Sequence, residues 1–111
     1  MTDAQAVRAL AALAHPLRLQ VFRMLVAAAP EAIAAGVIAD RLDVPASSLS
    51  FHLSQLQQAG LLTATRQQRF ILYATSVTAT RRLLEFLTAD CCRGRPELCG
   101  DLASLVDCET H

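Results

Sequence analysis

The fold is decided by residues 44–75, VPASSLSFHLSQLQQAGLLTATRQQRFILYAT. Its first half predicts a helix over residues 47–58, because leucines recur there at the spacing of one helix face and can pack inward. These leucines are Leu49, Leu53 and Leu56. Ala59 and Gly60 end the helix, and glycine can adopt the left-handed conformation in which many helices end. The stretch therefore begins with a helix that has one apolar face and a defined end.

The second half of the stretch predicts a β-hairpin. Residues 62–65 and 70–75 are rich in threonine, aromatic and branched side chains, which favour strands. Residues 66–69, Arg-Gln-Gln-Arg, join the two strands. Because this connection contains neither Gly nor Asn, we expect a less tight turn than one of two residues.

Helices are also predicted on both sides of this stretch, from apolar residues at helical spacing and from the breaks at Pro16 and Pro30. They cover residues 4–13, the run between those two prolines, and residues 33–42, 77–88 and 96–106. The first helix carries an apolar stripe of Val7, Leu10 and Leu13. Four helices, a hairpin and two further helices are typical of a winged helix-turn-helix fold, mainly α with a two-stranded β-hairpin.

Length and composition limit the class of protein. A chain of 111 residues supports a single domain, residues 1–111, with a modest core. Alanine and leucine account for much of the 53% hydrophobic fraction, which favours helices over sheet. The apolar stretches are too short to span a membrane, and the N-terminus lacks the features of a secretory signal. We therefore expect a cytoplasmic protein with no membrane partner.

The charges are unevenly distributed, although the formal net charge is zero. Residues 1–82 hold eight of the ten arginines and four of the ten acids, a balance of +4, and residues 83–111 carry −4. A basic body with an acidic tail suits a protein that contacts nucleic acid locally.

The outward face of the helix over residues 47–58 has side chains suited to DNA. Small hydroxyls and amides allow a helix to approach base edges closely, and glutamine can pair with adenine through two hydrogen bonds. Phe51 has two interpretations, contact with a thymine methyl group or packing on the hairpin. A polar face alone could simply be solvated, but the adjoining turn and hairpin favour DNA.

Phosphate contacts are expected from outside this helix, because it carries no arginine or lysine. The hairpin supplies Arg66 and Arg69, and Arg41 is a further candidate. The predicted DNA-binding residues are Ser47, Ser48, Ser50, Phe51, Ser54, Gln55, Arg66 and Arg69.

Residues 44–62 resemble the recognition segment of the ArsR/SmtB family of metalloregulatory repressors. Residues 13–19, LAHPLRL, resemble that family's junction between its first two helices. The resemblance covers nearly the whole chain, in order. It implies a homodimeric repressor whose first helix and post-hairpin helix form the interface, bound to an imperfect palindrome of operator DNA in its own promoter.

All four cysteines lie in a thiol-rich C-terminal segment, residues 90–111, at Cys91, Cys92, Cys99 and Cys108. In a reducing compartment, such thiols are more often ligands or redox groups than a disulfide framework. Two known sensor positions of the ArsR/SmtB family are missing here: residues 33–42 carry no thiol, and residues 77–89 carry no histidine. What remains resembles the C-terminal Cys-Cys pair with a later cysteine that arsenite-responsive members carry.

The chemistry of these thiols supports that resemblance. Trivalent arsenic is a soft centre that binds thiolates, typically three at once. We therefore expect Cys91, Cys92 and Cys99 to bind trivalent arsenic, or antimony, as the inducer, with no organic cofactor. Cys108 is expected to be a spare thiol, and a zinc site would need it as the fourth ligand. His15 and His52 are expected to be structural, hydrogen-bonding residues.

The sequence thus predicts a DNA-binding transcriptional repressor that trivalent arsenic releases from its operator. Two alternatives use the same scaffold: methylarsenite sensed by Cys91 and Cys92 alone, and thiol oxidation. An enzyme such as a small arsenate reductase is not expected, because the chain has no Cys-x5-Arg motif and no glycine-rich phosphate loop.

Overall fold

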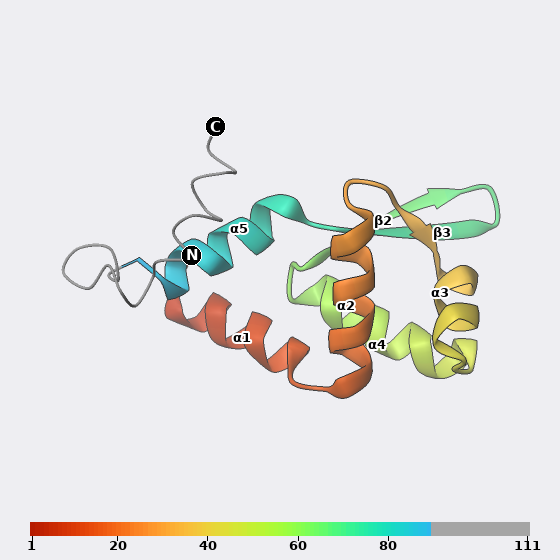
Figure 1. Cartoon of the computed structure of the whole chain (residues 1–111), viewed down its shortest axis with the longest axis horizontal. Helices are drawn as coiled ribbons and strands as arrows, with labels where there is room; N and C mark the ends of the chain where they lie inside the picture. The colour runs from red at the N-terminus through yellow and green to blue at the C-terminus, as the bar shows by residue number, and fades with distance from the viewer. Residues whose placement is uncertain (90–111) are drawn as a thin grey trace.

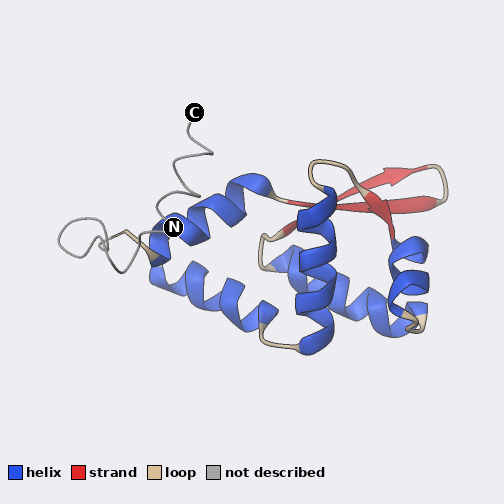
Figure 2. Cartoon of the chain, in the orientation of Figure 1, coloured by secondary structure: helices blue, strands red, loops and turns tan. Residues whose placement is uncertain are grey.

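The computed structural model describes residues 1–89, which form five helices and three strands (Figures 1 and 2). Their order is α1 (Asp3–Leu13), α2 (Pro16–Ala28), β1 (Ile33–Ala34), α3 (Ala35–Leu42), α4 (Ala46–Gln58), β2 (Leu62–Gln67), β3 (Phe70–Thr75) and α5 (Val77–Leu87). The predicted winged helix-turn-helix fold is confirmed. The helix predicted over residues 96–106 and the thiol-rich segment 90–111 lie outside the described residues.

The helices and strands form a central part with one further group of elements at each end of the molecule (Figure 1). One end holds α1 and α5, which contact each other, and the other holds α3 and the β2–β3 hairpin. Between them, α2 and α4 contact each other.

The sheet contains a short strand that the sequence analysis assigned to a helix. β1 pairs antiparallel with β3, with Ile33 opposite Tyr73 and Ala34 opposite Leu72, so the strand order is β1-β3-β2. The predicted helix over residues 33–42 is therefore wrong for its first two residues, and α3 begins at Ala35. Backbone pairing along the second edge of β3 replaces a first helical turn.

The hairpin turn is tighter than predicted. Gln67 pairs with Phe70, so only Gln68 and Arg69 connect the strands, and Arg66 belongs to β2. Gln68 adopts the left-handed conformation, with φ of 56°, that a two-residue turn usually assigns to Gly or Asn. The expectation of a looser turn was wrong, because β2 and β3 stay paired up to Gln67 and Phe70.

The leucine face of α4 lies at the centre of the hydrophobic core, as predicted. Leu49, Leu53 and Leu56 are each at most 1% exposed. The side chains that share this core at a similar depth are Val21, Leu25, Ile38 and Leu61. α4 is therefore held in one rotational setting, with its opposite face directed outward.

The helices α1 and α5 leave large apolar side chains exposed. The side chains that α1 buries are small, and α5 buries only Leu83. α1 buries Ala6, Ala9 and Ala12. The stripe predicted on this helix lies partly outside the core, because Val7 is 64% exposed and Leu10 is 43% exposed. On α5, Leu84 and Leu87 are likewise exposed. A single chain thus presents apolar surface on α1 and α5, a feature typical of protein–protein contact.

Local hydrogen bonds explain where three helices begin. Thr2 and Gln5 form a reciprocal capping box at α1. The Nδ1 atom of His15 accepts from the backbone N–H of Leu17 at 3.1 Å, and Pro16 occupies the first helical position of α2. The Ser76 hydroxyl accepts from the backbone N–H of Ala79 and caps α5.

Among residues 1–89, no single helix is long and apolar enough to cross a membrane. α1 and α2 together reach the required length and hydropathy, but they are bent by 102° at the break between them.

The Leu53→Ala variant tests the core. Removing this buried side chain should lower the free energy of unfolding by about 2–5 kcal/mol, because the cavity adds to the lost transfer energy. Leu19→Ala, at a 45% exposed position on α2, is the matched control and should change it far less. Urea unfolding followed by circular dichroism at fixed protein concentration measures both. Equal losses in the two variants would contradict the assigned core.

Candidate DNA-binding surface

α3 and α4 form the helix-turn-helix through a short, well-defined connection. Asp43 ends α3 in the left-handed conformation, with φ of 54°. The backbone N–H of Val44 then donates to the carbonyl of Ala39 at 3.1 Å. Pro45 precedes the first residue of α4, so the connection is only three residues long. The turn and the leucine core together fix the direction of α4.

The outward face of α4 carries the side chains that the sequence analysis assigned to base contacts. Ser47, Ser48 and Ser50 are exposed, and Phe51 is 57% exposed. Ser54 and Gln55 are half-buried toward the end of the helix. The Ser54 hydroxyl accepts a hydrogen bond from Nε2 of Gln58 at 3.2 Å, which ties together two polar residues one turn apart. The predicted face is thus continuous and mostly open.

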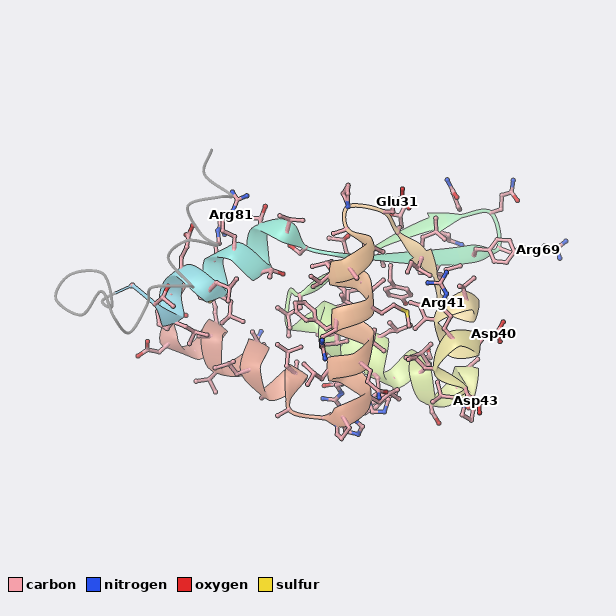
Figure 3. All side chains as sticks on the ribbon, in the orientation of Figure 1. Glu31, Asp40, Arg41, Asp43, Arg69 and Arg81 are labelled. Atoms are coloured by element: carbon pink, nitrogen blue, oxygen red, sulfur yellow. The ribbon has the colours of Figure 1, made fainter. Side chains whose placement is uncertain are left out.

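The hairpin places its two arginines at its outer end. Arg66 on β2 and Arg69 in the turn are both exposed. Figure 3 shows Arg69 extending away from the tip of the hairpin. Arg41, the further candidate, is exposed in the last turn of α3. Positive charge is therefore available on the hairpin and on α3, which lie at the same end of the molecule.

Sequence reasoning missed a cationic residue that contacts α4. Arg18 comes from α2, and its Nε donates to Nδ1 of His52 on α4 at 3.0 Å. The signal was present, because Arg18 lies three residues after His15 and so on the same side of α2. Which residue of α4 it meets depends on tertiary packing. Arg18 thus brings a cation to a helix that has no arginine or lysine of its own.

A small aromatic cluster surrounds this contact. The His15 and His52 rings lie 4.5 Å apart between centroids, and His52 meets Phe51 edge-on at 5.5 Å. The guanidinium carbon of Arg18 lies 5.6 Å from the centroid of the Phe51 ring. Phe51 thus contacts Arg18 and His52. Its two interpretations, contact with a thymine methyl group or packing on the hairpin, both stay predictions. As expected, both histidines accept hydrogen bonds that stabilise the fold.

Burial lowers the pKa of His52 below its ordinary value of 6.5, and the charges of His15 and Arg18 lower it further. A neutral ring is also what the hydrogen bond requires, because Nδ1 must keep its lone pair to accept from Arg18. The cluster therefore favours an uncharged His52 beside the arginine.

The predicted arsenic ligands, Cys91, Cys92 and Cys99, lie outside the described residues, as does Cys108. In the described part of the chain, no group of three or more His, Cys, Asp or Glu side chains is placed to hold a metal ion.

Comparison with known proteins finds transcriptional regulators. A family model described as a helix-turn-helix domain matches residues 13–64. The transcriptional activator HlyU of Vibrio cholerae is 32% identical over 85 residues, covering 77% of this chain and 76% of HlyU. The nodulation protein NolR of Rhizobium meliloti is 34% identical over 79 residues, covering 71% of this chain and 62% of NolR. HlyU is named as a transcriptional activator, and neither relative is named as an enzyme.

Solved structures agree with the sequence relatives. Reduced HlyU from Vibrio cholerae superposes with a TM-score of 0.62 at 30% identity, covering 78% of this chain and 88% of that one. A domain from Mycobacterium bovis superposes with a TM-score of 0.64 at 26% identity, covering 82% and 89%. That domain is described as homodimeric, winged helix-turn-helix, DNA-binding and from a possible ArsR-family transcriptional regulator.

The pKa of His52 predicts a pH dependence of stability. The folded state favours the neutral ring, whereas the unfolded chain takes up a proton near pH 6.5. The contribution of neutral His52 to the free energy of unfolding is therefore fully present above that pH and is lost as the pH falls below it. Urea midpoints at about pH 7.5 and 5.5 bracket this change. The midpoint should fall less for His52→Gln, which keeps an acceptor for Arg18, than for the parent.

His111→Gln is the matched control, because it removes a histidine that is distant in sequence from this cluster. It should keep the parent's pH dependence. If His52→Gln and the parent lost stability equally, the cause assigned here would be wrong.

Proposed function

This chain belongs to the ArsR-like family of winged helix-turn-helix transcriptional regulators, and from that premise we propose that it is an arsenic-responsive repressor of its own promoter. The cytoplasm is its proposed place of action. As a dimer, it would bind an imperfect palindrome, with one α4 helix in the major groove of each half-site.

One observation carries DNA binding: the buried leucines of α4 direct a face of small hydroxyls and amides away from the core. Such a face can approach base edges closely. The proposed base-reading residues are Ser47, Ser48, Ser50, Phe51, Ser54 and Gln55. Arg66 and Arg69 on the hairpin are proposed to hold the phosphates, since cationic contacts provide affinity and register.

The exposed apolar side chains of α1 and α5 support a homodimer. Val7 and Leu10 on α1, and Leu84 and Leu87 on α5, are all at least 43% exposed in a single chain. α1 and α5 contact each other, so these residues belong to one end of the molecule. Pairing two such ends would remove apolar surface from water. The Mycobacterium bovis domain of similar fold is described as homodimeric.

The direction of regulation is part of the proposal. The Vibrio relative is named as an activator, so the fold alone does not decide between activation and repression. Repression rests on the resemblance of residues 44–62 and of the C-terminal thiols to arsenite-responsive repressors.

The proposed inducer site is formed by Cys91, Cys92 and Cys99. All thiols of the chain follow residue 90, so a thiol sensor would have to use this segment. Three thiolates are the donor set that trivalent arsenic or antimony prefers. Arg93 and Arg95 lie between the pair and the third cysteine, and their charge favours the thiolate form.

Induction requires that the ligand-bound protein bind DNA more weakly than the free protein. The coupling free energy of such switches is commonly about 1–3 kcal/mol, or about 5- to 150-fold in affinity. Two other signals use the same scaffold: methylarsenite, which needs only Cys91 and Cys92, and thiol oxidation. Oxidation is worth testing because a solved structure of the HlyU relative is described as reduced.

Fluorescence anisotropy of the reduced protein on labelled DNA from its own promoter tests this proposal. Arsenite should release the parent, raising the apparent Kd by about 5- to 150-fold. Cys99→Ser should abolish the response to arsenite, because it leaves two thiolates. Cys108→Ser is the matched control and should respond as the parent does.

Other outcomes decide between the signals. If methylarsenite released Cys99→Ser from DNA as effectively as it releases the parent, the signal would be assigned to the Cys91–Cys92 pair. Release by hydrogen peroxide, but not by arsenite, would assign it to oxidation. DNA binding that none of these compounds changes would contradict the proposed sensor and leave the DNA-binding proposal intact.

A further inference from the structure

A positively charged groove runs between α1 and the C-terminal half of α4. It consists of two adjoining cavities, of about 360 and 270 Å³, which share Arg8, Gln58 and Ala59 in their linings. The larger one reaches Ser76, which caps α5, and Arg82 in the middle of that helix, and the smaller one reaches Arg18 and Gln55. We call this feature the α1–α4 groove.

The lining of the groove suits an anion. It includes three arginines, Arg8, Arg18 and Arg82, and no aspartate or glutamate among residues 1–89 lines either cavity. In the described part of the chain, no carboxylate pairs with Arg8 or Arg82. Their charges are therefore not neutralised there, and side-chain amides beside them can also donate hydrogen bonds. The amides are those of Gln5, Gln55 and Gln58.

The groove continues from the face of α4 that is proposed to read bases. Gln55 and Gln58 lie four and seven residues after Phe51, so all three residues share one side of the helix. Arg18 joins the two regions, because it lines the groove and also contacts His52 and Phe51. A duplex lying along this side of α4 would extend toward Arg8 and Arg82.

We infer that the α1–α4 groove is a second DNA contact, which binds phosphates of the operator backbone through Arg8 and Arg82. This inference rests on the proposed DNA-binding function. The site is separate from the hairpin, because its lining comes from α1, α2, α4 and α5 and their connections. Its contacts add affinity without reading sequence.

The salt dependence of DNA binding tests this inference. Each phosphate contact contributes about 0.9 to the slope of log K against log salt. Arg8→Gln should therefore reduce that slope by about two in a dimer, and Arg82→Gln should do the same. The affinity for operator and for unrelated DNA should fall by the same factor. Both arginines are exposed, so neither substitution opens the core.

Two controls isolate the charge. Arg23→Gln removes an exposed arginine of α2 that lines neither cavity, and it should leave the slope unchanged. Arg8→Lys keeps the charge and should keep most of the parent's slope. Gel filtration and thermal unfolding confirm that each variant keeps the parent's assembly and fold.

The possible failures can be told apart. If the parent does not bind DNA, the proposed function fails. If the parent binds DNA and Arg8→Gln and Arg82→Gln keep its slope, the groove is not a DNA contact. An affinity that rises in these variants also overturns the inference, because it would indicate that the acidic residues 83–111 occupy the groove. Inorganic phosphate could instead stabilise the parent against thermal unfolding while the variants keep the parent's salt dependence of DNA binding. That result would assign the groove to a small anion.

Discussion

The burial of one face of α4 is the constraint on which the rest of the structure depends. Leu49, Leu53 and Leu56 fill the centre of the core, and a rotation of the helix would expose them to water. The helix can therefore present only one other face. On that face the chain has placed serines, glutamines and a single phenylalanine. The side chains available to a DNA groove follow from how the leucines pack.

The charges that complement this face come from other elements. α4 carries no arginine or lysine, and the hairpin, α2, α1 and α5 bring Arg66, Arg69, Arg18, Arg8 and Arg82 to the regions around it. A helix without long cationic side chains can lie close to base edges while its neighbours hold the phosphates. Six of the ten acidic residues and all the thiols lie in residues 83–111, so the proposed sensing chemistry is separate in sequence from the proposed contacts.

Within residues 1–89, sequence periodicity predicted the helices, the hairpin and the buried face of α4, because each depends on a local repeat. It did not predict β1, whose two residues are strand only because β3 offers an edge beside them. Nor did it predict the contact of Arg18 with His52, which are 34 residues apart. It also could not show that α1 buries alanines and exposes Val7, since the side of a helix that meets the core is a tertiary property.

Hydrogen–deuterium exchange of the protein with and without its operator DNA measures which surface contacts the duplex. We predict that DNA slows exchange in peptides from residues 44–75, which contain α4 and the hairpin. Peptides from the second half of α2 should not change. Bound DNA with no protection in residues 44–75 would contradict the account, because another surface would then hold the duplex.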